Sequence, residues 1–188
     1  MLSSARNRVM LITNDYELIY NEIKRIYYLC INEARLYCPH CGQEVVYRDS
    51  RLRIWRHCDE PADRILIHRM YCRTCNRLHT VLPDVLVPHK HYGATEIETV
   101  LENEVRIDEV SDSTAAHWRQ WIRGNEAQIE GVLQSLKLEA GDKLPELRST
   151  ENLFIQLKKT VRKWLSVVSR LVVNGGFEFL PVLQCCHT

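Results

Sequence analysis

Two Cys-x-x-Cys pairs are the residues in this sequence whose type and spacing most clearly predict chemistry. The pairs lie in CPHCG and CRTCN, and their four cysteines are Cys38, Cys41, Cys72 and Cys75. Pro39 restricts φ in the first turn, and Gly42 permits the positive φ that often follows the second cysteine. Two such turns, called knuckles below, supply the four soft ligands of a closed tetrahedral Zn²⁺ site. The sequence therefore predicts structural zinc, which contributes folding energy rather than catalysis.

Other interpretations of the cysteines remain open, because the chain has eight of them. An iron–sulfur or redox centre, or paired disulfides, would use the same four residues. Cys58 is an alternative ligand, and the histidine-rich stretch 79–91 is a candidate second metal site. Cys30 lies in an apolar run and is expected to be a small buried hydrophobe. Cys185 and Cys186, at the end of the sequence, are assigned no role.

The elements that must position the knuckles are predicted to be short β-strands. The candidate strands are rich in β-branched and aromatic residues and comprise 45–47, 52–55 and 65–71. Residues 59–63 between them have the composition of a turn. We therefore predict a small antiparallel zinc ribbon followed by an extended connector, together spanning 38–92.

Residues 1–37 are expected to support this ribbon with one helix and one strand. Asn14 or Asp15 is a candidate N-cap for the helix. Its apolar positions follow helical spacing and are Leu18, Ile19, Ile23 and Ile26. The strand is expected at 27–31.

Helical patterns begin near residue 93. A first helix is predicted over 94–105, and a second begins after a cap at 111–113 and ends at Gly124. In the second helix Trp118, Trp121 and Ile122 form a stripe that is expected to pack on the first helix. Two helices joined by a short connection, here over 93–124, have the form of a helix-turn-helix. A purely structural helix pair fits the same pattern.

The residues proposed to contact DNA are polar or basic and lie in two places. On the second helix they are Ser113, Thr114, His117, Arg119 and Gln120. On the ribbon they are the arginines Arg48, Arg51, Arg53 and Arg73, which are expected to contact phosphate. Arginines near aromatic residues suit RNA or single strands equally well. The alternative is a solvated sheet face with cation–π pairs.

A long C-terminal helix is predicted within the helical region 125–188. It begins near Ser149, and Asn174 and the two glycines after it end the helix. Its apolar stripe recurs every three or four residues and consists of Leu153, Leu157, Val161, Leu165, Val168 and Val172. Such a stripe is either core or the seam of a homodimer. The predicted fold class is α+β: a zinc ribbon, a helix-turn-helix domain and a long helix.

Several segments together resemble a largely uncharacterised bacterial family of zinc-ribbon and helix-turn-helix proteins associated with mobile elements. They are CPHCG, YRDSR, CRTCNRLHTVLPD, PHKHY, SDSTAAHW and the tail over 164–176. The order of a knuckle pair followed by a helix-turn-helix is also similar to the N-terminal region of insertion-sequence transposases. The resemblance implies double-stranded DNA as a partner, a regulatory or accessory role in a mobile element, and a protein partner from the same element.

Charge and composition limit the function further. The chain has 25 Lys and Arg against 24 Asp and Glu, so DNA binding needs a localised basic face. Residues 38–92 hold 9 basic against 6 acidic residues, whereas 93–124 hold 3 against 7. No apolar stretch is long enough for a membrane span and no secretory signal is evident, so we expect a cytoplasmic protein without a membrane partner.

No Gly-rich phosphate loop, G-x-S-x-G or H-E-x-x-H motif is present, so no enzyme activity is expected. The favoured function is sequence-specific DNA binding by a protein with structural zinc. The alternative is a protein-interaction adaptor that binds a nuclease, polymerase or transposase through the ribbon and the long helix.

Overall fold

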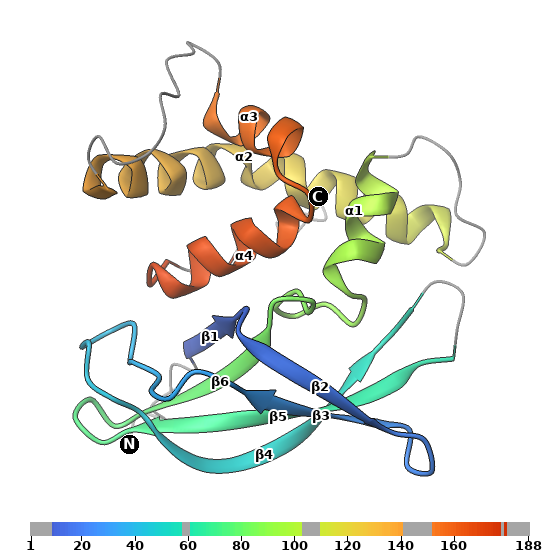
Figure 1. Ribbon diagram of the computed structural model, residues 1–188. Coiled ribbons are helices and arrows are strands. Elements are labelled where there is room, and N and C mark those ends of the chain that lie inside the picture. The colour runs from blue at the N-terminus through green and yellow to red at the C-terminus, as the bar shows by residue number, and fades with distance from the viewer. Residues whose placement is uncertain (1–8, 58–60, 103–109, 141–151, 178, 180–188) are drawn as a thin grey trace, which may run out of the picture.

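In the computed structural model, which describes residues 9–57, 61–102, 110–140, 152–177 and 179, a six-stranded mixed sheet carries helices on one face (Figure 1). The strands are β1 (Val9–Thr13), β2 (Tyr16–Asn21), β3 (Ile26–Ile31), β4 (Val46–Trp55), β5 (Asp63–Cys72) and β6 (Arg77–Pro83). The helices are α1 (Ala94–Glu102), α2 (Asp112–Ala140), α3 (Leu153–Thr160) and α4 (Trp164–Asn174). The strands curve beneath the helical layer, so the sheet has a covered inner face and an outer face (Figure 1).

Strand β5 organises the sheet. β4 pairs antiparallel with it from Val46 opposite Tyr71 to Trp55 opposite Asp63. On the other side of β5, β3 pairs in parallel with its first half and β6 pairs antiparallel with its second half. β1 then adds in parallel to β6, and β2 adds antiparallel to β3. The strands on either side of the knuckles therefore belong to one continuous sheet.

This topology contradicts the predicted zinc ribbon followed by a helix-turn-helix. The expected hairpin between the knuckles exists as β4 and β5, but three strands that precede Cys38 join the same sheet. The expected extended connector begins as β6, which lies between β5 and β1. Ile65 and Ile67 of β5 are fully buried against the helical side, so this sheet needs a helical layer to cover it.

The helix predicted near 14–26 is also wrong. This segment forms β2, a turn and the start of β3. Ile23, one of the apolar positions assigned to the helix, is 97% exposed in that turn, and Arg25 has a φ of 51°. The predicted strand at 27–31 is confirmed within β3, although Cys30 in it is half-buried rather than buried.

The predicted end of the second helix at Gly124 is wrong. Helix α2 passes through Gly124 and ends at Ala140, so that it is 29 residues long in all. Its buried stripe of Trp118, Trp121 and Ile122 is confirmed, and it continues at Ile129 and Val132 beyond the glycine. A Gly inside a helix costs only about 1 kcal/mol relative to Ala, which a buried stripe on both sides offsets. A straight helix of this length, packed across α1, α3 and α4, does not form the predicted helix-turn-helix.

The single long C-terminal helix that was predicted is instead two helices, α3 and α4. α3 ends where Val161 becomes extended, and α4 begins after Lys163, whose φ is 57°. The Glu98 carboxylate of α1 accepts a hydrogen bond from the backbone N–H of Leu165, and Trp164 Nε1 donates to Glu102 at 2.8 Å. Tertiary contacts with α1 thus hold the new helix start. The end of α4 at Asn174, followed by Gly175 as the cap, is confirmed.

Most of the apolar stripe predicted over 153–172 lies inside the core of this chain. Leu153, Leu165, Val168 and Val172 are buried among residues of α1 and α2. Within the described residues, no helix combines the length and hydrophobicity that a bilayer span requires.

Candidate metal centre and basic sheet face

The four cysteines of the two knuckles meet at one point. Their sulfur atoms all lie within 4.8 Å of one another, with Cys38 Sγ 3.6 Å from Cys75 Sγ and Cys41 Sγ 3.5 Å from Cys72 Sγ. A disulfide requires about 2.05 Å between sulfurs, so the paired-disulfide interpretation is wrong. Four thiolates about 2.3 Å from a central ion lie about 3.8 Å apart in a tetrahedron. The cluster therefore has the donor set and the spacing of a closed four-thiolate metal site.

Local backbone geometry explains why both segments form knuckles. In the first, Gly42 donates its N–H to the Cys38 carbonyl at 2.8 Å and has a φ of 68°. In the second, Asn76 takes a φ of 56°, and its side-chain oxygen accepts a hydrogen bond from the Tyr71 hydroxyl at 2.8 Å. Asn tolerates this left-handed region better than most residues. The positive φ expected at Gly42 is confirmed, and the second knuckle has the same feature at Asn76.

The sheet positions the two knuckles differently. Cys72 is the last residue of β5, so the second knuckle is the turn between β5 and β6. The first knuckle lies between β3 and β4 and is closed by a bridge between Tyr37 and Glu44. Cys72 and Cys75 are thus positioned by a β-hairpin. Cys38 and Cys41 lie on a loop, which a metal ion would hold against that hairpin.

The thiols have unequal affinities for protons. Burial raises the pKa of Cys72, but the N–H of Cys75 and neighbouring donors outweigh it and lower the pKa to about 7. Burial and hydrogen bonds with Cys72 and Cys38 raise the pKa of Cys75 to about 12. Without a metal the cluster therefore retains protons, and a metal must displace them when it binds.

A small core surrounds the cluster on the outer face of the sheet. Cys38 and Cys72 are buried with Leu11, Val45 and Val81. His79, in β6, is fully buried nearby, and neither of its ring nitrogens has a hydrogen-bond partner within the described residues. Burial, with smaller effects of Arg77 and His40, lowers its pKa. Protonating this imidazole would therefore destabilise the region.

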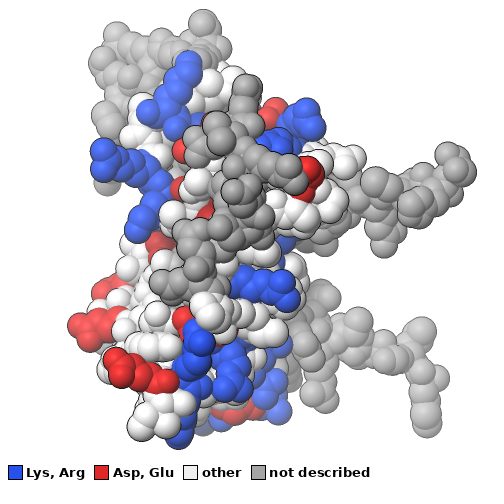
Figure 2. All heavy atoms as spheres, turned by 90° about the vertical axis from the view of Figure 1, so that its right-hand side faces the viewer, with Lys and Arg blue, Asp and Glu red and all other residues white. Residues whose placement is uncertain are grey.

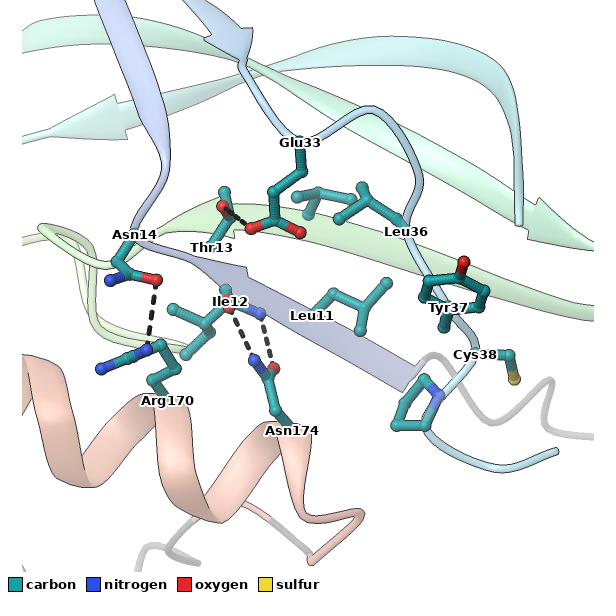
Figure 3. Close-up of a pocket in the computed structure, with 12 residues that line it drawn as sticks. Leu11, Ile12, Thr13, Asn14, Glu33, Leu36, Tyr37, Cys38, Arg170 and Asn174 are labelled. Atoms are coloured by element: carbon teal, nitrogen blue, oxygen red, sulfur yellow. Dashed lines mark hydrogen bonds between the residues drawn. The ribbon is translucent and has the colours of Figure 1, made fainter. Parts of the chain in front are cut away.

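Helix α4 also reaches the first knuckle, at a cavity of about 370 Å³ (Figure 3). The Asn174 side-chain amide makes two hydrogen bonds to the backbone of Ile12, at 2.7 and 2.8 Å. Arg170 donates to Asn14 at 3.1 Å, and Cys38 and Pro39 line the opposite wall (Figure 3). The free edge of β1 is thus capped by a side chain of the helical layer, which joins that layer to the metal-bearing end of the sheet.

The five α2 residues predicted to contact DNA lie in the first turns of that helix. Ser113, His117 and Gln120 are exposed and lie along one side, whereas Thr114 and Arg119 are half-buried. Arg119 donates a hydrogen bond to the Val100 carbonyl at 3.0 Å, so it joins α2 to α1. DNA contact by these residues stays a prediction.

The predicted ribbon arginines separate into exposed and half-buried side chains. Arg48, Arg51 and Arg73 are exposed. Lys and Arg side chains also gather on the sheet half of the side turned away from the knuckles, next to a group of acidic side chains (Figure 2). Arg53 is half-buried and donates to the carbonyls of Val87 and Lys90. Burial and the charge of Arg51 lower the pKa of Arg53 to about 10. This structural role of Arg53 was missed, because spacing alone does not show where the loop after β6 passes.

The histidines of 79–91, predicted as a second metal site, do not form one in the structure. Within the described residues, the four knuckle cysteines are the one group of three or more potential ligands close enough to share an ion, and no histidine of 79–91 joins such a group. Cys58, Cys185 and Cys186 lie outside the described residues.

Comparison with known proteins gives one finding. Residues 38–118 match the model of a family described as a domain of unknown function, DUF6431. No curated protein and no solved structure matches the chain. The matched segment begins at Cys38, includes both knuckles, and ends at Trp118 in α2. Over this segment, which contains all four clustered cysteines, the chain is similar to DUF6431.

Proposed function

We propose that this chain is a DNA-binding protein whose sheet is stabilised by structural Zn²⁺ at Cys38, Cys41, Cys72 and Cys75, and that it acts as a regulator or accessory factor of a mobile element. The four-thiolate cluster supports the metal part of the proposal. Exposed arginines on β4 and on the second knuckle support the nucleic-acid part.

Zinc is the ion that best suits the cluster. Four sulfur donors leave no open position for substrate, and tetrahedral thiolate sites in proteins hold zinc or iron. Cys38 and Cys72 lie in a core that has three other buried hydrophobic residues among the described residues, so an ion that supplies folding energy would explain how this end of the sheet folds. Metal analysis of the purified protein distinguishes colourless zinc from iron.

The arginines that carry the DNA proposal run along one strand. Val46 of β4 lies opposite Tyr71 of β5, so Arg48 lies near the second knuckle and its Arg73, and Arg51 follows three residues further along β4. Asp49 is the acidic residue within this strand, and it forms an ion pair with Arg69 and a longer one of 3.8 Å with Arg48. Arg51 and Arg73 are exposed, and guanidinium groups of this kind can contact phosphate.

A salt-dependent gel shift with genomic duplex fragments tests the DNA proposal. We expect binding that weakens steeply with salt, because phosphate contacts release counterions. The double variant R51A/R73A is expected to lower the slope of log K against log salt by about two units. The charge-matched variant K24A/R35A, which removes two exposed cations elsewhere, leaves the slope unchanged. Absence of duplex binding at any salt concentration contradicts the proposal.

A second candidate function is a protein-interaction adaptor, and the outer face of the sheet favours it. Ile19, Tyr28, Leu66 and Leu52 lie opposite one another across β2, β3, β5 and β4. Ile19 is 55% exposed and Leu52 47% exposed. A row of apolar side chains across four strands is the kind of surface that binds another protein.

Substitutions in this row separate the two functions. Ile19→Ser is expected to leave DNA binding intact if DNA binding is the function, because the substitution changes no charge. An adaptor that binds a nuclease, polymerase or transposase of the same element would lose that partner in Ile19→Ser and keep it in R51A/R73A. Light scattering on the free protein reports whether a second copy uses the same row.

A further inference from the structure

A cavity of about 470 Å³ lies between β4, the inner face of the sheet and the loop over 85–93. Its volume falls within the range of about 300–1,000 Å³ typical of small-ligand pockets. Five cationic or imidazole side chains line it, and they are Arg51, Arg53, His89, Lys90 and His91. Met10 of β1 and Leu82 of β6 contribute apolar wall. The cavity thus combines a basic rim with an apolar floor.

The loop that carries three of these side chains is held in place by β4. Arg53 donates to the Val87 and Lys90 carbonyls, and the backbone N–H of Arg56 donates to the His91 carbonyl at 2.8 Å. The loop closes on itself where the Ala94 N–H donates to the Val85 carbonyl at 2.8 Å. The rim is therefore fixed before any ligand arrives, which lowers the entropy lost on binding.

Glycine at position 93 lets the loop pack closely against β4. A Cβ atom at Gly93 would lie 2.9 Å from Trp55 Nε1 and closer still to the Glu96 carboxylate. A larger residue would therefore require the Glu96 and Trp55 side chains to shift.

Within the described residues, no ion pair joins Arg53 or His89 to an acidic side chain. Burial, followed by the charges of Arg53, Lys90 and Arg51, lowers the pKa of His89, so at neutral pH this imidazole is uncharged and offers a ring N–H as a hydrogen-bond donor. The Lys90 ammonium lies 4.4 Å from the centre of the Trp121 ring, so it contacts an aromatic face rather than a carboxylate. Like charges at close range in a partly buried site are costly unless an anion joins them.

We propose that this cavity binds a nucleoside phosphate, with the phosphate on Arg51, Arg53 and His89 and the base over the apolar floor. Arginine forks match phosphate oxygens in geometry, and guanidinium and imidazole planes stack on bases. The nucleotide is either one unit of a nucleic-acid strand or a free mononucleotide. This proposal assigns a site to the proposed DNA binding. It rests on that function for the nucleotide of a strand, but not for the free mononucleotide.

The test compares two probes on the full-length, metal-loaded protein. One is a fluorescein-labelled single-stranded oligonucleotide followed by anisotropy, and the other is adenosine monophosphate followed by calorimetry. Arg51→Ala and His89→Asn are the variants, because both side chains are exposed and Asn tolerates the φ of 61° at position 89. Each is expected to weaken binding about tenfold, the effect of losing one charge-assisted hydrogen bond. Lys24→Ala is the charge-matched control.

Each outcome has one meaning. Loss of strand binding in both variants, with or without binding of adenosine monophosphate, supports the cavity as a site for strand nucleotides. Binding of adenosine monophosphate alone, lost in the variants, supports the cavity as a mononucleotide site and overturns its role for a strand, while the duplex gel shift tests the proposed DNA function separately. Strand binding that both variants retain overturns the cavity and leaves DNA binding in place. Inorganic phosphate that binds as tightly as adenosine monophosphate contradicts the role of the apolar floor.

Discussion

Among the described residues, the helical core contains 18 buried residues from α1 to α4 and the loop before α1, whereas the core beside the knuckles contains five. Two of those five, Cys38 and Cys72, belong to the cluster of four cysteines that is positioned to bind a metal ion. Burial of apolar surface, at about 25 cal/mol per Å², stabilises the helical layer more than the knuckle end. If the proposed zinc is bound, we expect the stability of the knuckle end to depend on it.

The two regions also respond to protons in opposite directions. In the helical layer, burial raises the pKa of Glu98 to about 7, against the effect of its hydrogen bond from Leu165. Beside the knuckles, burial lowers the pKa of His79. Acid therefore relieves a buried charge in one region and creates one in the other.

The largest expected effect is removal of a metal ligand. Cys72→Ser abolishes metal binding and removes a contribution on the order of 10 kcal/mol, which is comparable with the stability of a whole domain. We expect amide hydrogens at 36–45 and 72–77 to lose protection while those of α2 and α4 keep it. Hydrogen exchange and metal content measure both effects. Cys30→Ser is the matched control, and a Cys72→Ser protein with full metal content would contradict the comparison.

The next largest effect is expected from a substitution that creates a cavity in the helical core. Leu165 is fully buried, so Leu165→Ala is expected to lower the free energy of unfolding by about 2–5 kcal/mol. Urea denaturation measures the change, and metal content should remain at the wild-type value. Leu157→Ala, at a half-buried position of α3, is expected to cost less. Loss of metal from Leu165→Ala would show that the two regions do not fold independently.

A smaller effect is expected at the start of α4. Glu98→Ala removes the acceptor for the Leu165 N–H and should cost about 0.5–2 kcal/mol, as removal of a helix cap does. Glu98→Gln keeps an acceptor and removes the charge. Because the folded pKa of Glu98 is raised, the wild type gains stability as the pH falls from about 7 towards the unfolded value. Glu98→Gln should therefore be the more stable protein at pH 8, and that advantage should shrink at pH 5; an advantage independent of pH contradicts the account.

The smallest expected effect concerns His79. Its folded pKa lies below the unfolded value of about 6.5, so stability is complete above that pH and falls as the pH drops through it. His79→Leu is expected to reduce this acid sensitivity, which for one proton is at most about 1.4 kcal/mol per pH unit. Thermal unfolding between pH 7 and pH 5 in excess zinc measures the slope, and an unchanged slope shows that the imidazole is not the cause.

The same contrast explains what the sequence could predict. The knuckles are local: Pro39, Gly42 and the cysteine spacing determine them within a few residues, and the structure confirms the four-sulfur cluster. The hairpin between them and the buried Trp118 and Trp121 stripe also follow local patterns.

The structural features that the sequence did not predict depend on contacts between residues far apart in the chain. β1 pairs with β6, which lies far along the chain, as in the pairing of Val9 with His79, and no local signal at 9–13 indicates that pairing. The apolar stripe over 153–172 continues in helical period, yet the helix breaks at 161–163, where α1 supplies Glu98 to begin a new one. At Gly124 the reverse holds, since buried residues on both sides carry α2 through a residue that usually ends helices. In each case a tertiary contact overrides a local preference.

X-ray absorption at the zinc edge of the purified protein is the most direct test of the central claim, that a closed four-thiolate zinc site holds the knuckle end of the sheet. The account predicts one zinc per chain with four sulfur neighbours at about 2.3 Å. A folded protein that contains no metal, or a zinc ion with nitrogen or oxygen among its ligands, would contradict it.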